Sequence, residues 1–178
     1  LDKIGNEKAE LKDRETTEKI KEEVSKVPLK VEKVDKRERT RNPQAPYTTS
    51  KLQQEGFTRL GFPAAKTMRV AQKLYEGIEL GAEGTVGLIT YMRTDSVNIS
   101  VAAQTEAADY IRQKFGDNFL PPKPPIYKSK KNAQEAHEAV RPSSAKREPE
   151  SIRGYLTEEE FKLYDLIWKK FVSSQMVP

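Results

Sequence analysis

The sequence predicts a mainly α-helical protein of the α+β class. Between Tyr47 and Val172, several segments carry apolar residues three and four positions apart, which is typical of helices packed against a core. Before them, Val27, Leu29 and Val31 alternate with polar residues, which predicts one half-buried strand over residues 27–34. We therefore expect a helical body preceded by a short β segment.

The N-terminal 46 residues are expected to form a helix, the strand and a linker. A short helix is plausible over 17–26, within a region dense in charges of both signs. The strand runs into a basic stretch, 36–41, for which a solvated strand end and a phosphate contact both remain open. The segment 42–46, Asn-Pro-Gln-Ala-Pro, contains two prolines and predicts an extended linker and a boundary.

The helices after residue 47 are delimited by capping signals. Ser50 and Gln53 have the spacing of a capping box for a helix that Gly61 ends, and Pro63 begins a second helix over 64–76. In the second helix, the residues expected to face the core are Met68, Ala71, Leu74 and Tyr75.

The second half continues with alternating loops and helices. The glycine-rich interval 77–87 lacks a phosphate-loop ending and is interpreted as a turn, and 88–92 reads as a short strand. Ser100 caps a helix whose apolar positions are Val101, Ala108, Ile111 and Phe115. A proline-rich loop, a helical turn over 134–140 and a last helix follow. Thr157 and Glu160 open this last helix, and its apolar face comprises Phe161, Tyr164, Trp168, Phe171 and Val172.

Composition excludes several kinds of chemistry. The 178 residues contain no Cys and one His, so disulfides, thiolate catalysis and the usual zinc sites are excluded. A net charge of +5 permits a polyanionic partner without requiring one, and no apolar run approaches the roughly twenty residues of a membrane span, so we expect a soluble protein. Because the chain starts at Leu1 without a Met or signal sequence, we expect an internal fragment.

Tyrosine is the remaining nucleophile. Its ordinary pKa of about 10 means that attack on phosphorus needs nearby cations. In an extended chain, Arg93 lies on the same side as Tyr91 and its guanidinium can clamp a phosphate. The same spacing at Tyr110 and Arg112 lies in a predicted helix, where residues two apart do not face each other, so spacing alone is no signal.

His137 and Arg141 form a second constellation. On a helical turn these residues, four positions apart, would share one face and could bind a phosphate together. From these residues alone, the interpretation that His137 is a packed or solvated side chain without a function is equally good.

Four ordered blocks resemble bacterial DNA topoisomerase I, of the type IA family. The segment 87–96, Gly-Leu-Ile-Thr-Tyr-Met-Arg-Thr-Asp-Ser, is similar to the family's active-site segment. The segment 46–54 resembles its Pro-Phe/Tyr-Thr-Thr-Ser-x-Leu-Gln-Gln block, 66–77 its following helix, and 133–142 its Gln-Glu-Ala-His-Glu-Ala-Ile/Val-Arg-Pro block. Met92 favours topoisomerase I over topoisomerase III relatives, which usually carry proline there.

The resemblance implies a set of site residues. Tyr91 would be the nucleophile that forms a 5′-phosphotyrosyl bond, Arg93 would hold the scissile phosphate, and His137 would lie beside them. The residues that match the lining of the family's DNA site are Gln72, Glu76, Thr90, Asp95, Ser96 and Arg141.

The resemblance also implies an architecture. The family core is a torus in which a mostly helical gate domain, here 47–168, is carried on mainly β arms. Residues 1–46 would be part of an arm with its linker, and 169–178 would return into that arm. The Toprim domain with its Mg²⁺ site is missing, so we expect this fragment to bind no metal, to bind DNA weakly and not to relax supercoils alone.

The implied partners are DNA, cleaved as a single strand, and the remaining domains of the same topoisomerase chain, in the cytoplasm at the nucleoid. The alternative is a non-enzymatic nucleic-acid-binding helical module in which Tyr91 packs or stacks on a base. A protein-interaction domain is a third reading, and DNA affinity independent of salt would favour it.

Overall fold

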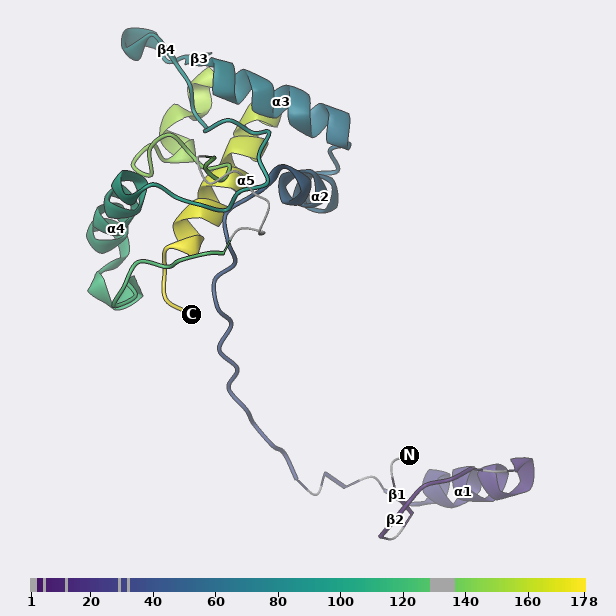
Figure 1. Cartoon of the computed structure of the whole chain (residues 1–178). Helices are drawn as coiled ribbons and strands as arrows, with labels where there is room; N and C mark the ends of the chain where they lie inside the picture. Colours follow the sequence, from purple (N-terminus) through teal and green to yellow (C-terminus); the bar gives the residue numbers. More distant parts are fainter. Residues whose placement is uncertain (1–2, 5, 12, 29, 32, 129–136) are drawn as a thin grey trace. The chain divides into compact units, whose positions relative to one another are not determined.

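The computed structural model describes the chain except residues 1–2, 5, 12, 29, 32 and 129–136. The chain divides into two compact units, Leu1–Arg39 and Thr40–Pro178, which we call the N-terminal unit and the helical unit. Figure 1 labels the elements of both units.

The N-terminal unit contains a small hairpin and one helix. Strand β1 (Lys3–Ile4) pairs antiparallel with β2 (Glu7–Lys8), and helix α1 (Arg14–Lys26) follows. Asp13 caps α1 by accepting from the Thr16 N–H at 2.7 Å, but the helix has no buried residue. A helix of 13 residues without a packed face is marginal in water, so this unit has little stability of its own.

The strand predicted over 27–34 is wrong for the residues that the structure describes. Val27, Val31 and Val34 are exposed by 62, 76 and 69%, and no described residue of this range is in a strand. Leu29 lies outside the described residues. An alternating pattern forms a strand only where a second strand completes its hydrogen bonds, and the described chain pairs none with it.

The helical unit is built on three packed helices. Helices α2 (Thr49–Leu60), α3 (Ala64–Glu76) and α5 (Glu158–Ser174) contact one another pairwise, and α4 (Val101–Phe115) completes the core (Figure 1). The shorter elements are β3 (Ile78–Glu79), β4 (Thr85–Val86) and the 3₁₀ helices η1 (Gly81–Glu83), η2 (Asp117–Phe119) and η3 (Pro149–Tyr155). The mainly α prediction is confirmed.

The N-cap of helix α2 lies two residues before the predicted cap. Thr48, not Ser50, is the N-cap: its backbone is extended and its side chain accepts from the Lys51 N–H at 3.4 Å. The predicted capping box failed because three adjacent hydroxyl residues offered competing caps. Gly61 ends the helix as predicted, with φ of 67° in the left-handed region that favours glycine.

Two of the predicted helix faces differ from those observed. On α3, Ala71 and Leu74 are buried as expected, but Tyr75 is 41% exposed. On α4, Ile111 is buried, whereas Val101 is 78% exposed and the buried face is Ala103, Ala107, Tyr110 and Ile111. Tyr110 turns this face inward, because its ring packs edge-on against Trp168 at 5.6 Å.

The C-terminal helix follows its predicted signals. Thr157 and Glu160 form the capping box, and Tyr164, Trp168, Phe171 and Val172 are buried in the core. Helix α5 continues to Ser174, and the Val177 N–H donates to Phe119. The chain after residue 168 therefore continues α5 in the helical unit, and its expected return into an arm stays a prediction.

The glycine-rich interval forms a turn, as predicted. It is the antiparallel hairpin β3–β4, with positive φ at Gly77, Gly81 and Gly84. No helix in the part of the chain that the structure describes combines the length and the apolar character that a membrane crossing needs.

Candidate active site

The segment after the hairpin carries the predicted nucleophile. Instead of the predicted strand over 88–92, only Ile89 forms a bridge, to Pro142. The side chains nevertheless alternate: Tyr91, Arg93 and Asp95 are exposed, while Met92, Thr94 and Ser96 are buried. This alternation puts Tyr91 and Arg93 on the same open side of an extended segment, as the spacing predicts.

Thr49 fixes the segment on the C-terminal side of the tyrosine. Its N–H donates to the Thr94 carbonyl at 2.9 Å, and its hydroxyl accepts from the Thr94 N–H at 2.8 Å. The same hydroxyl donates to the Met92 carbonyl at 2.7 Å. Since Thr49 is the first residue of α2, a free helix-end N–H and one side chain together hold the backbone on both sides of Arg93.

Thr90 fixes the segment on the N-terminal side. Its hydroxyl donates to the Ala139 carbonyl at 2.6 Å and accepts from the Arg141 N–H at 3.0 Å. Its own N–H donates to the Arg141 carbonyl at 2.9 Å. The tyrosine is therefore held between two threonines, and Thr90 links it to the segment that carries His137.

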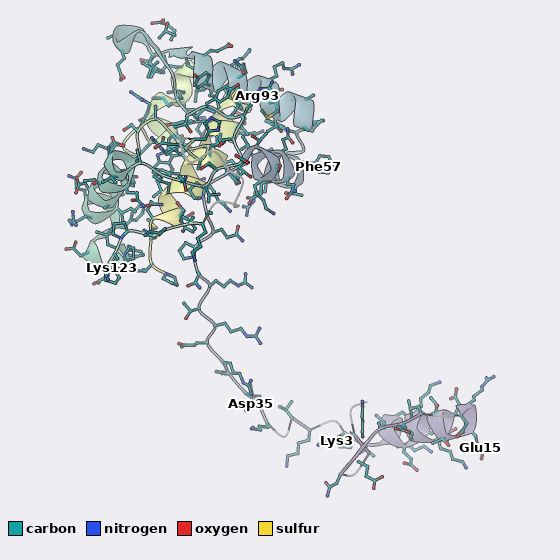
Figure 2. The ribbon with its side chains drawn as sticks, in the orientation of Figure 1. Lys3, Glu15, Asp35, Phe57, Arg93 and Lys123 are labelled. Carbon is teal, nitrogen blue, oxygen red and sulfur yellow. The ribbon has the colours of Figure 1, made fainter. Side chains whose placement is uncertain are left out.

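These tethers create one open hollow beside the tyrosine. Its volume is about 310 Å³, and its lining residues are Tyr75, Thr90, Tyr91, Arg93, Thr94, His137 and Glu138. Tyr91 is 48% exposed and His137 is exposed. The three residues predicted to be catalytic thus meet at one surface. Figure 2 labels Arg93 in the helical unit, on the side that carries α3.

The helical turn predicted over 134–140 is wrong in its described part. Residues 137–139 are not helical and Val140 forms a bridge to Tyr47, while 134–136 lie outside the described residues. The Ala139 N–H donates to the Asn98 carbonyl and the Val140 N–H to the Tyr47 carbonyl, both at 2.8 Å. These partners from distant segments replace the bonds within a helical turn.

Arg141 does not line the hollow. Its guanidinium pairs with the Glu138 carboxylate through Nε at 3.1 Å and through Nη2, and its side chain is only 11% exposed. Burial acts to raise the pKa of Glu138, but the Ser100 N–H and the Arg141 charge outweigh it and hold that pKa below its ordinary value.

Four other predicted DNA-site residues are not among those that line the hollow. Gln72 and Glu76 lie on α3 and hydrogen-bond to each other. Asp95 lines a neighbouring hollow of about 710 Å³ together with Lys51. Ser96 is buried and its hydroxyl accepts from the Asn98 N–H at 3.1 Å.

Three residues of the site were not identified from the sequence. Tyr75 was assigned to the core, while Thr49 and Glu138 were given no role. Thr49 and Glu138 stand inside the family-like blocks, but their function depends on contacts 43 and 38 residues away in sequence. Such contacts leave no local periodicity.

The described residues do not provide a metal site. Among them, no group of three or more His, Asp or Glu side chains lies close enough together to hold an ion. The chemistry available at the hollow is that of a phenol flanked by a guanidinium and an imidazole, which suits an anionic phosphodiester.

The comparisons with known proteins show the family to which the chain belongs. A family model described as DNA topoisomerase matches residues 2–178. DNA topoisomerase 1 of Xylella fastidiosa strain 9a5c is 56% identical over 158 residues, and that of strain Temecula1 is 58% identical over 151. These matches cover 88 and 84% of this chain, but only 19 and 18% of the relatives' length.

A solved structure is also similar. Full-length topoisomerase I from Thermotoga maritima matches with a TM-score of 0.67 and 43% identity, over 77% of this chain and 21% of that one. The chain belongs to the DNA topoisomerase family, and within it to the bacterial type IA enzymes.

Proposed function

We propose that this chain carries the nucleophile of a bacterial type IA topoisomerase, and that Tyr91 is that nucleophile. The observation that carries the proposal is the shared hollow, in which a half-exposed phenol stands beside Arg93 and His137. Because the chain spans about a fifth of its relatives' length, the relaxation of negatively supercoiled DNA is proposed for the whole enzyme.

The proposed reaction exchanges one ester for another. The Tyr91 oxygen attacks the phosphorus of one DNA strand and loses its proton, the bond from phosphorus to the 3′ oxygen breaks, and that oxygen gains a proton. The products are a 5′-phosphotyrosyl bond and a free 3′-hydroxyl. Because the energy of the phosphodiester is conserved, the 3′-hydroxyl can attack the phosphotyrosine after strand passage and religate the strand without ATP.

Arg93 is proposed to bind the scissile phosphate. Its planar guanidinium can donate to two phosphate oxygens and stabilise the charge that develops on them. His137 supplies a further donor from the opposite segment. Thr49 and Thr90 hold these groups together, which favours the orientation that an in-line attack requires.

The surrounding residues are proposed to contact the DNA strand beyond the scissile bond. Gln72 and Glu76 on α3, together with Thr90 and Asp95, would line its path, and the buried Ser96 would support this segment without touching the strand. For Arg141 the ion pair with Glu138 supports a role in shaping the wall of the site, with any phosphate contact secondary.

The remaining parts of the proposal concern the whole enzyme. The resemblance implies a Mg²⁺ ion that residues of other domains would hold. The substrate is proposed to be single-stranded at the moment of cleavage, the partners are the other domains of the topoisomerase, and the location is the nucleoid. The N-terminal unit is proposed to belong to an arm of the torus.

The test is formation of a covalent protein–DNA adduct. The matching segment of Xylella fastidiosa DNA topoisomerase 1 is replaced by this chain, and the chimera is incubated with labelled single-stranded DNA and denatured. We expect an adduct that Tyr91→Phe abolishes and the control Tyr155→Phe retains. DNA binding by a chimera that folds and never forms the adduct would instead favour the non-enzymatic binding module.

A further inference from the structure

Tyr75 has an unusual place for a large aromatic side chain on a packed helix. It lies in the last turn of α3 but is 41% exposed, while Ala71 and Leu74 of the same helix are fully buried. It lines the hollow of the proposed nucleophile. Its exposed ring therefore belongs to the site and not to the core.

The ring of Tyr75 contacts the ring of Tyr91 directly. Their centroids are 5.3 Å apart and the planes meet at 62°, an edge-to-face arrangement. In this geometry the positive edge of one ring meets the negative face of the other, which favours one orientation over free rotation. About half of the Tyr91 surface is open to solvent, so the Tyr75 ring is a main constraint on an exposed side chain.

The backbone fixes the distance between the two rings. The Leu88 N–H donates to the Leu74 carbonyl at 2.7 Å, so the end of α3 is joined to the segment that leads to Tyr91. At Gly87, an added Cβ would lie 2.8 Å from the Tyr75 carbonyl oxygen, so the two backbones meet there more closely than any side chain allows. Tyr75 is thus anchored to the segment that it contacts.

We propose that Tyr75 is a positioning residue for the Tyr91 nucleophile, an inference that rests on the proposed function. The Tyr75 ring restricts the Tyr91 ring to the orientation in which its hydroxyl faces the phosphate held by Arg93. In this role Tyr75 acts on the Tyr91 ring and not on the phosphate or the leaving oxygen. Its contribution is the aromatic edge, which phenylalanine also provides and leucine does not.

The first experiment separates positioning from binding in the chimera with the Xylella enzyme. At saturating single-stranded DNA, we expect Tyr75→Leu to slow single-turnover adduct formation roughly 2- to 12-fold, as expected for loss of one aromatic pair. The Kd for DNA should change less than about twofold, and Tyr75→Phe should retain the wild-type rate. The matched control is Phe57→Leu, which alters an aromatic residue 63% exposed on α2 and should leave the rate unchanged.

A second measurement needs only the 178-residue chain. In a sample with ¹³C-labelled tyrosine, the Tyr91 ring signals, identified by their loss in Tyr91→Phe, should shift in Tyr75→Leu because the neighbouring ring current is removed. They should not shift in Phe57→Leu. This result is independent of whether the chimera folds.

Four results would overturn the inference. The first is a wild-type rate of adduct formation for Tyr75→Leu, and the second is an effect of Tyr75→Leu on the Kd for DNA alone, as expected if Tyr75 stacks on a base. The third is an equal loss of rate in Tyr75→Phe, and the fourth is unchanged Tyr91 ring signals in Tyr75→Leu. Failure of the proposed function looks different, because the wild-type chimera would then bind DNA without forming an adduct.

Discussion

Replacement of Thr90 by valine tests the tether that joins Tyr91 to the His137 segment. Valine keeps the shape of threonine but removes a hydroxyl that donates to Ala139 at 2.6 Å and accepts from the Arg141 N–H at 3.0 Å. One lost hydrogen bond costs about 1 kcal/mol, and a backbone N–H left without a partner costs about 1–3 kcal/mol. We therefore expect Thr90→Val to lower the free energy of unfolding by about 2–4 kcal/mol.

The assay is urea unfolding followed by the fluorescence of Trp168. This residue is the only tryptophan of the chain and is buried in the core of the helical unit, so it reports that unit alone. The control is Thr58→Val, which removes a hydroxyl bonded to the Gln54 carbonyl on an exposed helix surface. We expect the control to stay within about 0.5 kcal/mol of wild type. If both variants lose the same small amount, the tether does not stabilise the site.

Two further predictions concern residues beside the tyrosine segment, Gly87 and Glu138. Gly87→Ala should destabilise the helical unit by about 1–2 kcal/mol, because the added Cβ would lie 2.8 Å from the Tyr75 carbonyl oxygen. The control Gly154→Ala, where the added Cβ meets open space, should leave stability unchanged. Equal urea midpoints for the two variants would contradict the prediction. Glu138→Gln should cost stability at neutral pH. The hydrogen bond from the Ser100 N–H and the Arg141 charge outweigh burial and hold the folded-state pKa of Glu138 below 4.5. The contribution of Glu138 to stability is therefore present above that pH and is lost as the pH falls through the lower, folded value. The stability gap between wild type and Glu138→Gln should therefore close in acid, and a gap that widens there would refute the pairing.

The parts of the fold predictable from the sequence are those determined by neighbouring residues. The capping box of Thr157 and Glu160 and the glycine end at Gly61 were identified because each acts within one helical turn. The strand predicted at 27–34 does not form in the described chain. Its alternating pattern indicates which face is apolar, but not which second strand would complete its backbone hydrogen bonds.

The candidate site was also predictable only in part. The spacing of Tyr91 and Arg93 and the family resemblance predict these two residues, and in the structure both line one hollow with His137. The structure pairs Arg141 with Glu138, three residues earlier, and its contact with a phosphate stays a prediction. Helical spacing places Tyr75 on the core-facing side of its helix. It does not show that Tyr91, from a separate segment, packs against the Tyr75 ring and makes it part of the site.

The most direct test of the central claim is to locate the attachment point of the DNA. The adduct formed by the chimera is digested with nuclease and protease, and the peptides are analysed by mass spectrometry. We predict a nucleotide attached through its 5′ phosphate to Tyr91 and to no other residue. A nucleotide on a different tyrosine, or an adduct that persists in Tyr91→Phe, would contradict the account.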